Sequence, residues 1–325
     1  MTVLHDFRQH LLDRRVELEA WGRYVMQYVQ SQVDRSKVSL QIVSSRAKEV
    51  DSAVGKIARK NYTDPFAQMT DLVGVRFVVL ISPQIDLIAS IIDSCAAWNA
   101  SLDRDSNQEI DAAPENFSYQ SKHYVVRCAQ DFLHEGLVIK QGLACEIQIR
   151  TIMQHAYAEI THDSIYKPSA GRIPPKARRF VASSMALIET ADHLFCETMR
   201  LLEEENRPRN RLWEGLVDLY SSSLGDVGVG FDEKLNLEVL DSCDEYRSDT
   251  ALEEIKHFFQ SRQILLDKIK DRIQTDPFWS QPTALYAYWL VQRDSRNAFD
   301  VWPFASAHDA LLMVYSDLGV SPRLH

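Results

Sequence analysis

One stretch constrains the fold of this chain more than any other, residues 145–167, CEIQIRTIMQHAYAEITHDSIYK. Its first residues alternate between polar and apolar side chains, which is the period of a β-strand. Glu146, Gln148 and Arg150 would then share one face, and the two isoleucines between them would share the other. The remainder is a helix rich in ionisable residues. This pattern predicts a sheet with one face open as a cleft, with an exposed edge strand as the alternative.

Several other segments have the periodicity of regular structure. The stretch from Asn99 to Asn116 is polar and acidic without any period, and we expect a loop there. By apolar spacing and β-branched content, we expect strands at 38–45, 71–80, 118–128 and 143–151, and helices at 5–33, 49–60, 84–98, 151–164 and 176–205.

The run EEENRPRNR interrupts the helical pattern with charges, a proline and two asparagines. We place a domain boundary there, which predicts one domain over 1–205 and a second over 212–325. The second is expected to be mostly helical, with an accessory or regulatory role. Its aromatic residues are expected to form an ordinary core, and a docking surface is the alternative.

Composition limits the classes of function. The net charge of −10 argues against broad, nonspecific coating of DNA. The charged N-terminus lacks the apolar segment of a signal peptide, and no run of 18 apolar residues predicts a membrane span. The five cysteines are scattered and include no CxxC pair. We therefore expect a cytoplasmic protein with reduced thiols.

Two carboxylates and a group of basic residues are candidates for phosphate chemistry. Asp71 opens the strand DLVGVRFVV, and Glu146 lies on the polar face of EIQIR; carboxylates at strand ends suit Mg²⁺. A capping role is the alternative for Asp71. Arg46, Lys48 and Lys56 come from the segment SRAKEVDSAVGKIARK and suit a polyphosphate, although they could equally form a solvated basic face.

Two further motifs have weaker meanings alone. Tyr119 in YQSKHY could stack on a purine base or pack as a core tyrosine. His155, Glu159 and His162 fall on one helical stripe, but the HExxH order of zinc hydrolases is absent. We interpret this stripe as a wall of the cleft.

In their order along the chain, SRAK, DLVGVRFVV, YQSKHYVV and EIQIRTIMQHAYAEITHDSIYK resemble the synthetase domain of the RelA/SpoT family, the ATP-dependent alarmone pyrophosphokinases. The resemblance covers about residues 5–200. It is closest to the short, single-function branch, which contains small alarmone synthetases and toxic relatives. It implies an α+β fold in which helices flank a mixed β-sheet, similar to nucleotidyltransferases.

The resemblance also implies roles for individual residues. Asp71 and Glu146 would hold Mg²⁺, and Glu146 would also activate the acceptor hydroxyl. Tyr119 would stack on the acceptor's guanine. The resemblance assigns the ATP side to Arg46, Lys48, Lys56 and Arg76, and positions on the acceptor side of the cleft to Gln148, Arg150 and His155.

The activity implied is transfer of the β,γ-pyrophosphate of ATP to the 3′-hydroxyl of GDP, GTP or an adenosine nucleotide. Many relatives have a basic run before the stacking tyrosine, where this chain has the acidic EIDAAPENFSY, with Ser118 in the usual glycine position. That departure keeps the 3′-CCA end of uncharged tRNA as an alternative acceptor. A non-catalytic nucleotide sensor is the second alternative. The resemblance is also compatible with a homo-oligomer and with a neutralising or regulatory protein partner.

Overall fold

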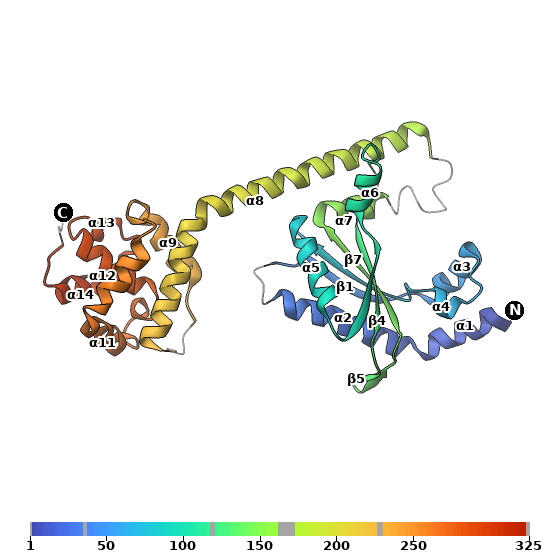
Figure 1. Cartoon of the computed structure of the whole chain (residues 1–325), viewed down its shortest axis with the longest axis horizontal. Helices are drawn as coiled ribbons and strands as arrows, with labels where there is room; N and C mark the ends of the chain where they lie inside the picture. Colours follow the sequence, from blue (N-terminus) through green and yellow to red (C-terminus); the bar gives the residue numbers. More distant parts are fainter. Residues whose placement is uncertain (1, 35–37, 118–120, 162–172, 226–229, 323–325) are drawn as a thin grey trace. The chain divides into compact units, whose positions relative to one another are not determined.

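The computed structural model describes residues 2–34, 38–117, 121–161, 173–225 and 230–322 (Figure 1). The chain divides into two compact units, Met1–Met199 and Arg200–His325. Each unit has its own cluster of buried apolar side chains.

The first unit is built on a five-stranded sheet with the order β1-β2-β7-β4-β3. Strands β2 and β7 are parallel, whereas the other neighbours are antiparallel. The sheet is therefore mixed, and the predicted α+β fold class is confirmed. A separate pair of short strands, β5 (Phe132–His134) and β6 (Leu137–Ile139), forms a second sheet. The strands of the main sheet are β1 (Ile42–Ala47), β2 (Val73–Val79), β3 (Trp98–Arg104), β4 (Lys122–Cys128) and β7 (Ala144–Thr151).

Helices cover the apolar face of this sheet. Val75, Phe77, Ile147 and Ile149 alternate with polar neighbours along β2 and β7, and all four are buried. Helices α2 and α5 pack against that side of the sheet. The helices of this unit are α1 (Thr2–Asp13), α2 (Arg15–Val33), α3 (Val50–Lys60), α4 (Pro65–Gln68), α5 (Pro83–Ser94), α6 (Ser106–Ala112), α7 (Ile152–Thr161) and the first half of α8 (Pro175–Leu224).

Two expectations for the first unit are wrong. The helix predicted over 5–33 is interrupted at Arg14, whose backbone (φ −99°, ψ 2°) leaves the helical region and separates α1 from α2. The loop predicted over Asn99–Asn116 contains most of β3 and all of α6. Strand β3 lies at an edge of the sheet and is mostly exposed. It therefore lacks the apolar alternation by which a half-buried strand is recognised in a sequence.

Helix α8 also differs from its predicted length. It was expected to end at residue 205, but it continues through EEENRPRNR with Pro208 inside it. A proline removes one backbone hydrogen bond and crowds the preceding turn. The following turns carry Leu212, Leu216 and Tyr220, which are buried in the second unit. Packing of these side chains stabilises helix beyond the proline, an effect that local propensity does not include.

The second unit is helical, as expected. Its elements after α8 are α9 (Glu233–Ser242), η3 (Asp244–Tyr246), α10 (Ala251–Gln260), α11 (Gln263–Arg272), η4 (Pro277–Ser280), α12 (Thr283–Arg293), α13 (Ala298–Val301), η5 (Ala305–Ala307) and α14 (His308–Leu318). Helix α12 is buried on all sides from Thr283 to Val291. The aromatic residues Trp279, Tyr286 and Tyr288 are buried, which confirms the ordinary-core interpretation for them.

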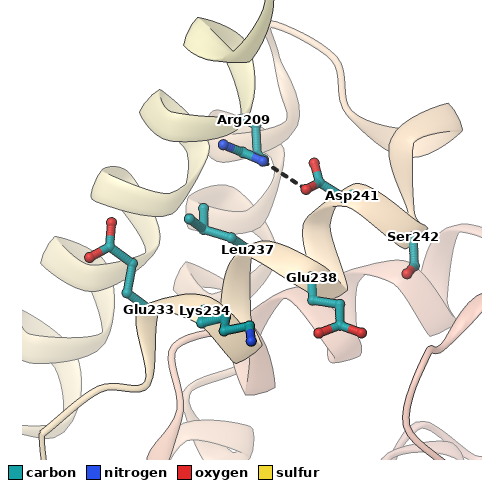
Figure 2. A pocket seen from close by; sticks show the side chains of 7 residues that line it. All are labelled: Arg209, Glu233, Lys234, Leu237, Glu238, Asp241 and Ser242. Carbon is teal, nitrogen blue, oxygen red and sulfur yellow. Dashed lines mark hydrogen bonds and ion pairs between the residues drawn. The ribbon is translucent and has the colours of Figure 1, made fainter. Parts of the chain in front are cut away.

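A shallow pocket lies on the second unit between α8 and α9 (Figure 2). Charges of both signs line it, and Arg209 on α8 forms an ion pair of 2.7 Å with Asp241 on α9. Within the described part of the chain, no helix is both long and apolar enough to cross a membrane.

Candidate active site

A row of polar side chains crosses the face of the sheet opposite the core. Gln148 on β7 pairs in register with Arg76 on β2 and with His123 on β4. The row continues to Ser44 on β1 and to Arg104 on β3. Residues that are directly opposite on neighbouring strands point to the same face. The sheet therefore presents one polar residue from each of its five strands in a single line.

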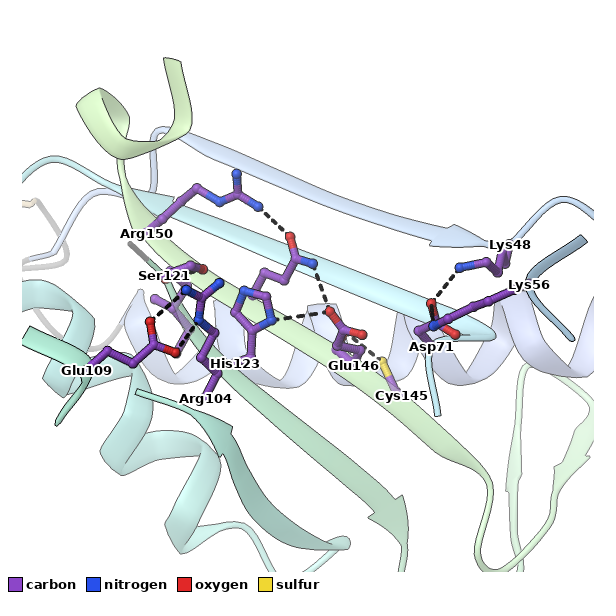
Figure 3. Close-up of polar contacts among 12 residues, drawn as sticks. Lys48, Lys56, Asp71, Arg104, Glu109, Ser121, His123, Cys145, Glu146 and Arg150 are labelled. Carbon is purple, nitrogen blue, oxygen red and sulfur yellow. Dashed lines mark hydrogen bonds and ion pairs between the residues drawn. The ribbon is translucent and has the colours of Figure 1, made fainter. Parts of the chain in front are cut away.

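A chain of hydrogen bonds runs along β7 at the centre of this row (Figure 3). The Gln148 amide donates to Glu146 Oε1 at 2.8 Å, and Arg150 donates to Gln148 Oε1. His123 Nδ1 lies 3.5 Å from the same Glu146 oxygen. The predicted alternation of EIQIR is thus present, and its three polar residues contact one another.

The electrostatics of His123 favour a neutral ring. Burial lowers the pKa of His123, and although Glu146 raises it, the positive charges of Arg104 and Arg150 lower it further. A neutral imidazole can donate from one nitrogen and accept at the other. His123 can therefore orient Glu146 as an uncharged neighbour.

Asp71 lies just before β2 and is held by two lysines (Figure 3). Lys48 and Lys56 donate to Asp71 Oδ2 at 2.5 and 2.7 Å. Burial alone would raise the pKa of Asp71, but these two hydrogen bonds outweigh it and lower the pKa below its ordinary value. The buried Oδ1 atom has no hydrogen-bond partner among the described residues. The carboxylate is thus ionised and has one oxygen available for a further ligand.

The face of the sheet is open between Arg46 and Glu146. The residue between them in register is Gly74, which has no side chain. A Cβ atom placed on Gly74 would meet no described atom within 4 Å. A ligand can therefore approach the backbone of β2 between a guanidinium and a carboxylate.

Helix α7 provides a charged wall beside this face. Arg76 donates to Glu159 Oε1 at 2.8 Å, and His155 Nδ1 lies 3.6 Å from the same oxygen. Burial lowers the pKa of His155, and the nearby Arg150 and Arg76 lower it further. Glu159 thus joins a predicted ATP-side residue to a predicted acceptor-side residue. His162, the third member of the predicted stripe, lies outside the described residues.

Most of the predicted residues fall into three contacting groups. Lys48 and Lys56 both form ion pairs with Asp71, so their ammonium groups are already paired with a carboxylate. Arg46 is exposed at the end of β1 and pairs in register with Gly74. Tyr119 lies outside the described residues, so its predicted stacking role stays a prediction. Glu146, Gln148 and Arg150 form a second group, joined by hydrogen bonds. Arg76 and His155 form a third, because both contact Glu159.

Three residues of the polar row, Ser44, His123 and Arg104, were missed in the sequence. His123 is two positions beyond Ser121 in YQSKHY, so strand alternation alone could have placed it on the same face as Tyr119. Arg104 lay in a segment expected to be a loop, and a β-bulge between Leu102 and Arg104 shifts its register. No periodic pattern pointed to it.

The donor set fits a magnesium ion. Mg²⁺ in phosphate-transfer sites is commonly held by one or two carboxylates, with substrate phosphates and water completing its coordination. Asp71 offers a buried oxygen without a partner, and Glu146 offers a second carboxylate on the open face. Among the described residues there is no group of three or more His, Cys, Asp or Glu that could hold a metal alone. The site therefore suits an ion that arrives with a nucleotide.

Comparison with known proteins identifies the region that contains this site. Residues 45–171 match the family described as a region found in RelA / SpoT proteins. No curated protein matches the chain.

Solved structures resemble the first unit at low sequence identity. The small alarmone synthetase 1 from Bacillus subtilis bound to its product pppGpp is 21% identical, with a TM-score of 0.50, over 61% of this chain and 98% of that one. A GTP pyrophosphokinase family protein from Streptococcus pneumoniae is 20% identical, also with a TM-score of 0.50, over 62% of this chain and 96% of the other. These similarities show a shared fold.

Proposed function

We propose that the first unit of this chain is a RelA/SpoT-family domain of the short synthetase type and that it is a pyrophosphotransferase; the family match over residues 45–171 and the shared fold support this. It transfers the β,γ-pyrophosphate of ATP to the 3′-hydroxyl of a guanosine or adenosine nucleotide and so makes an alarmone such as ppGpp or pppGpp. One observation carries this proposal: Glu146 shares the open face of the sheet with a line of basic and amide side chains, and a second carboxylate, Asp71, lies just before β2 and is held by two lysines.

The reaction joins the acceptor's 3′-oxygen to the β-phosphorus of ATP and breaks the bond from that phosphorus to the α-phosphate oxygen, so AMP leaves. Glu146, oriented by Gln148 and His123, takes the hydroxyl proton. Asp71 and Glu146 would hold Mg²⁺, which offsets the negative charge of the phosphates when bound. Lys48 and Lys56 keep Asp71 ionised and add positive charge beside it.

The two sides of the face suit different substrates. Arg46 and Arg76 lie on β1 and β2, on either side of the gap at Gly74, where guanidinium groups can contact the base or phosphates of ATP. Gln148 and Arg150 lie on β7, between β2 and β4, and we assign them to the acceptor together with Tyr119. In this arrangement Glu146 lies between donor and acceptor.

A tRNA acceptor is the alternative, and one observation favours it. Arg104, the cation at the β3 end of the polar row, forms ion pairs with Glu109 at 2.6 and 2.7 Å. This edge therefore offers less free positive charge for the 5′-phosphates of GDP or GTP. The 3′-terminal ribose of uncharged tRNA brings a free hydroxyl without those phosphates. The net charge of −10 opposes this alternative, because tRNA binding needs a basic surface.

The test is a transfer assay with purified full-length protein, Mg²⁺ and γ-labelled ATP. GDP, GTP, ADP and deacylated tRNA are offered separately as acceptors. We expect label on a nucleotide, and we expect Glu146→Gln to abolish the transfer while Glu203→Gln, an exposed carboxylate of α8, leaves it unchanged. Label only on tRNA would replace the alarmone proposal with the tRNA alternative. ATP binding without transfer to any acceptor would contradict both and favour a nucleotide sensor.

A further inference from the structure

The two parallel strands of the sheet, β2 and β7, end side by side, and one residue of α8 lies at that edge. Val79 and Thr151, the last residues of the two strands, are partners in register. Helix α7 begins directly after Thr151, and α5 begins directly after Ser82. The Oδ2 atom of Asp192 accepts hydrogen bonds from the hydroxyl groups of Thr151 at 2.8 Å and of Ser82 at 3.4 Å. Asp192 thus connects α8 to the end of β7 and to the start of α5.

Thr151 and Gln154 cap the first turn of α7 reciprocally. The backbone N–H of Gln154 donates to Thr151 Oγ1 at 3.2 Å, and the backbone N–H of Thr151 donates to Gln154 Oε1 at 3.0 Å. This is a capping box, in which each side chain satisfies a backbone donor at the start of the helix. Because Thr151 Oγ1 accepts from Gln154, its own hydrogen is directed to Asp192 Oδ2. Asp192 therefore sets the orientation of the hydroxyl group that caps α7.

The start of α7 is continuous with two parts of the candidate site. Arg150, the residue before Thr151, belongs to the hydrogen-bonded chain of Gln148 and Glu146. His155 lies in the first turn of α7 and contacts Glu159. A displacement of about 1 Å at a reacting centre lowers a rate by up to about 100-fold. The junction between β7 and α7 must therefore be held firmly if these side chains serve a reaction.

The burial of Asp192 is not explained by stability alone. Its side chain is only 5% exposed, and the buried Oδ1 atom has no hydrogen-bond partner in the described part of the chain. Such an oxygen costs stability. Burial also raises the pKa of Asp192, although the hydrogen bonds from Thr151 and Ser82 oppose this. A carboxylate presents only acceptors to the two hydroxyl groups, whereas an amide could turn a donor toward them. The feature that Asp192 supplies at this cost is a fixed orientation.

We propose that Asp192 is a positioning residue for pyrophosphate transfer, because it orients the Thr151 hydroxyl group that caps α7. The fixed start of α7 in turn holds Arg150 and His155 in place at the open face. Asp192 acts through Thr151 and not by contact with a nucleotide. This inference rests on the proposed function, and it adds to that function a residue of α8 that lies behind the sheet edge.

The experiment removes each side of the contact in the full-length protein and measures transfer to the acceptor that takes label in the assay above. Asp192→Ala removes the acceptor, and Thr151→Val removes the hydroxyl group with little change of shape. We expect each variant to lower kcat/KM for the acceptor by about tenfold, with a smaller change in ATP affinity. The double variant should be no slower than Thr151→Val alone, because both changes remove the same contact.

Conservative variants separate positioning from a merely structural role. Thr151→Ser keeps the hydroxyl group and should retain most of the rate, and Asp192→Asn keeps an acceptor and should retain part of it. Thr190→Val, which removes an exposed hydroxyl group from the same helix, is the matched control and should change nothing. Amide hydrogen exchange reports on α7 without any reaction, and it should become faster there in Asp192→Ala.

Three results would overturn the proposal. One is an additive loss of rate in the double variant, which would mean that the two side chains act independently. Another is a lower free energy of unfolding in Asp192→Ala with unchanged kcat/KM, which would make Asp192 a structural residue. The third is an equal rate in Thr151→Val and Thr151→Ser, a comparison that decides alone if Asp192→Ala fails to fold.

Failure of the proposed function has a different signature. A native chain that transfers pyrophosphate to no acceptor would contradict that function for every variant alike. Hydrogen exchange of α7 in Asp192→Ala requires no transfer, so it would still show whether Asp192 holds the start of this helix. Unchanged exchange would overturn the positioning role as well.

Discussion

Glu146 is the residue on which the proposed chemistry depends most. Its Oε1 atom accepts a hydrogen bond from the Gln148 amide and lies 3.5 Å from His123 Nδ1. These two contacts fix the Glu146 side chain on the open face. We expect Glu146→Gln to lower kcat by about 10²–10⁴-fold, because the amide cannot take a proton. ATP affinity without Mg²⁺ should change little. An active Glu146→Gln enzyme would assign the base elsewhere.

His123 should act through Glu146. We expect His123→Ala to lower kcat by roughly tenfold, because Glu146 loses an orienting neighbour, with a smaller effect on the KM for ATP. A full loss of ATP binding would instead mean that His123 contacts the nucleotide. His123→Asn, which retains a polar side chain, should recover part of the rate, and steady-state kinetics of both variants tests this.

Asp71 gives the reaction a predictable pH dependence. Burial raises its pKa, and Lys48 and Lys56 together lower it below the ordinary value. Removing one lysine by Lys56→Met weakens the lowering contribution, so the pKa of Asp71 rises. The acidic limb of the rate profile should then move to higher pH. Lys60→Met, an exposed lysine at the end of α3, is the control and should leave that limb in place.

At the scale of single elements, Gly74 on β2 is a position where a substitution should affect nucleotide binding without lowering stability. Gly74→Val adds a side chain where no described atom is within 4 Å, and a β-branched residue favours a strand. We expect the free energy of unfolding to stay the same or to rise by about 0.5–1 kcal/mol. ATP affinity should fall at least tenfold, because the new side chain fills the gap beside Arg46.

The matched control is Gly55→Ala on α3, where a Cβ also meets no described atom. It should stabilise the helix by about 0.5–1 kcal/mol and leave nucleotide binding intact. Denaturant unfolding and ATP titration of both variants test the pair. Unchanged ATP affinity in Gly74→Val would place the nucleotide away from β2.

Elements with one buried face were predictable from the sequence, and elements without one were not. Strands β2 and β7 carry Val75, Phe77 and Ile147 at the period of two, and they were placed within two residues of their ends. Strand β3 is an exposed edge and offered no such pattern. Arg14 interrupts the first helix through backbone geometry, which no apolar spacing reveals.

The same reasoning explains what the sequence revealed of the candidate site. Alternation predicts which side chains share a face within one strand, so Glu146, Gln148 and Arg150 were grouped correctly. It does not give the register between strands that are distant in sequence. The contacts of Asp71 with Lys48 and Lys56, and the position of His123 beside Gln148, depend on that register.

At the scale of the whole molecule, two separate cores predict two unfolding transitions. Asp317 in the second unit is the best probe of this, because its side chain is only 6% exposed and pairs with Lys268 and Arg272 at 2.7 and 2.6 Å. Burial would raise its pKa, but hydrogen bonds from Arg272, Lys268 and Tyr288 lower it to about 2. Asp317→Asn should cost about 3 kcal/mol.

The pH dependence of that stabilisation has a definite sign. The folded-state pKa of about 2 lies below the ordinary value of 3.8, so the stabilisation is present above pH 4 and is lost as the pH falls toward 2. Scanning calorimetry of Asp317→Asn at neutral pH should move one transition down by roughly 10 °C and leave the other in place. A single transition that shifts as a whole would show that the two units unfold together.

The strand register that aligns the polar row across the sheet also determines which side chains are buried in the core. Each strand contributes one residue, and a slip of one position in β2 or β7 would turn its polar residues into the core and its buried apolar residues outward. A chain with a misaligned row would thus expose valines and isoleucines, the surface that chaperones and proteases recognise. An error of register in the active face is therefore also an error in the core.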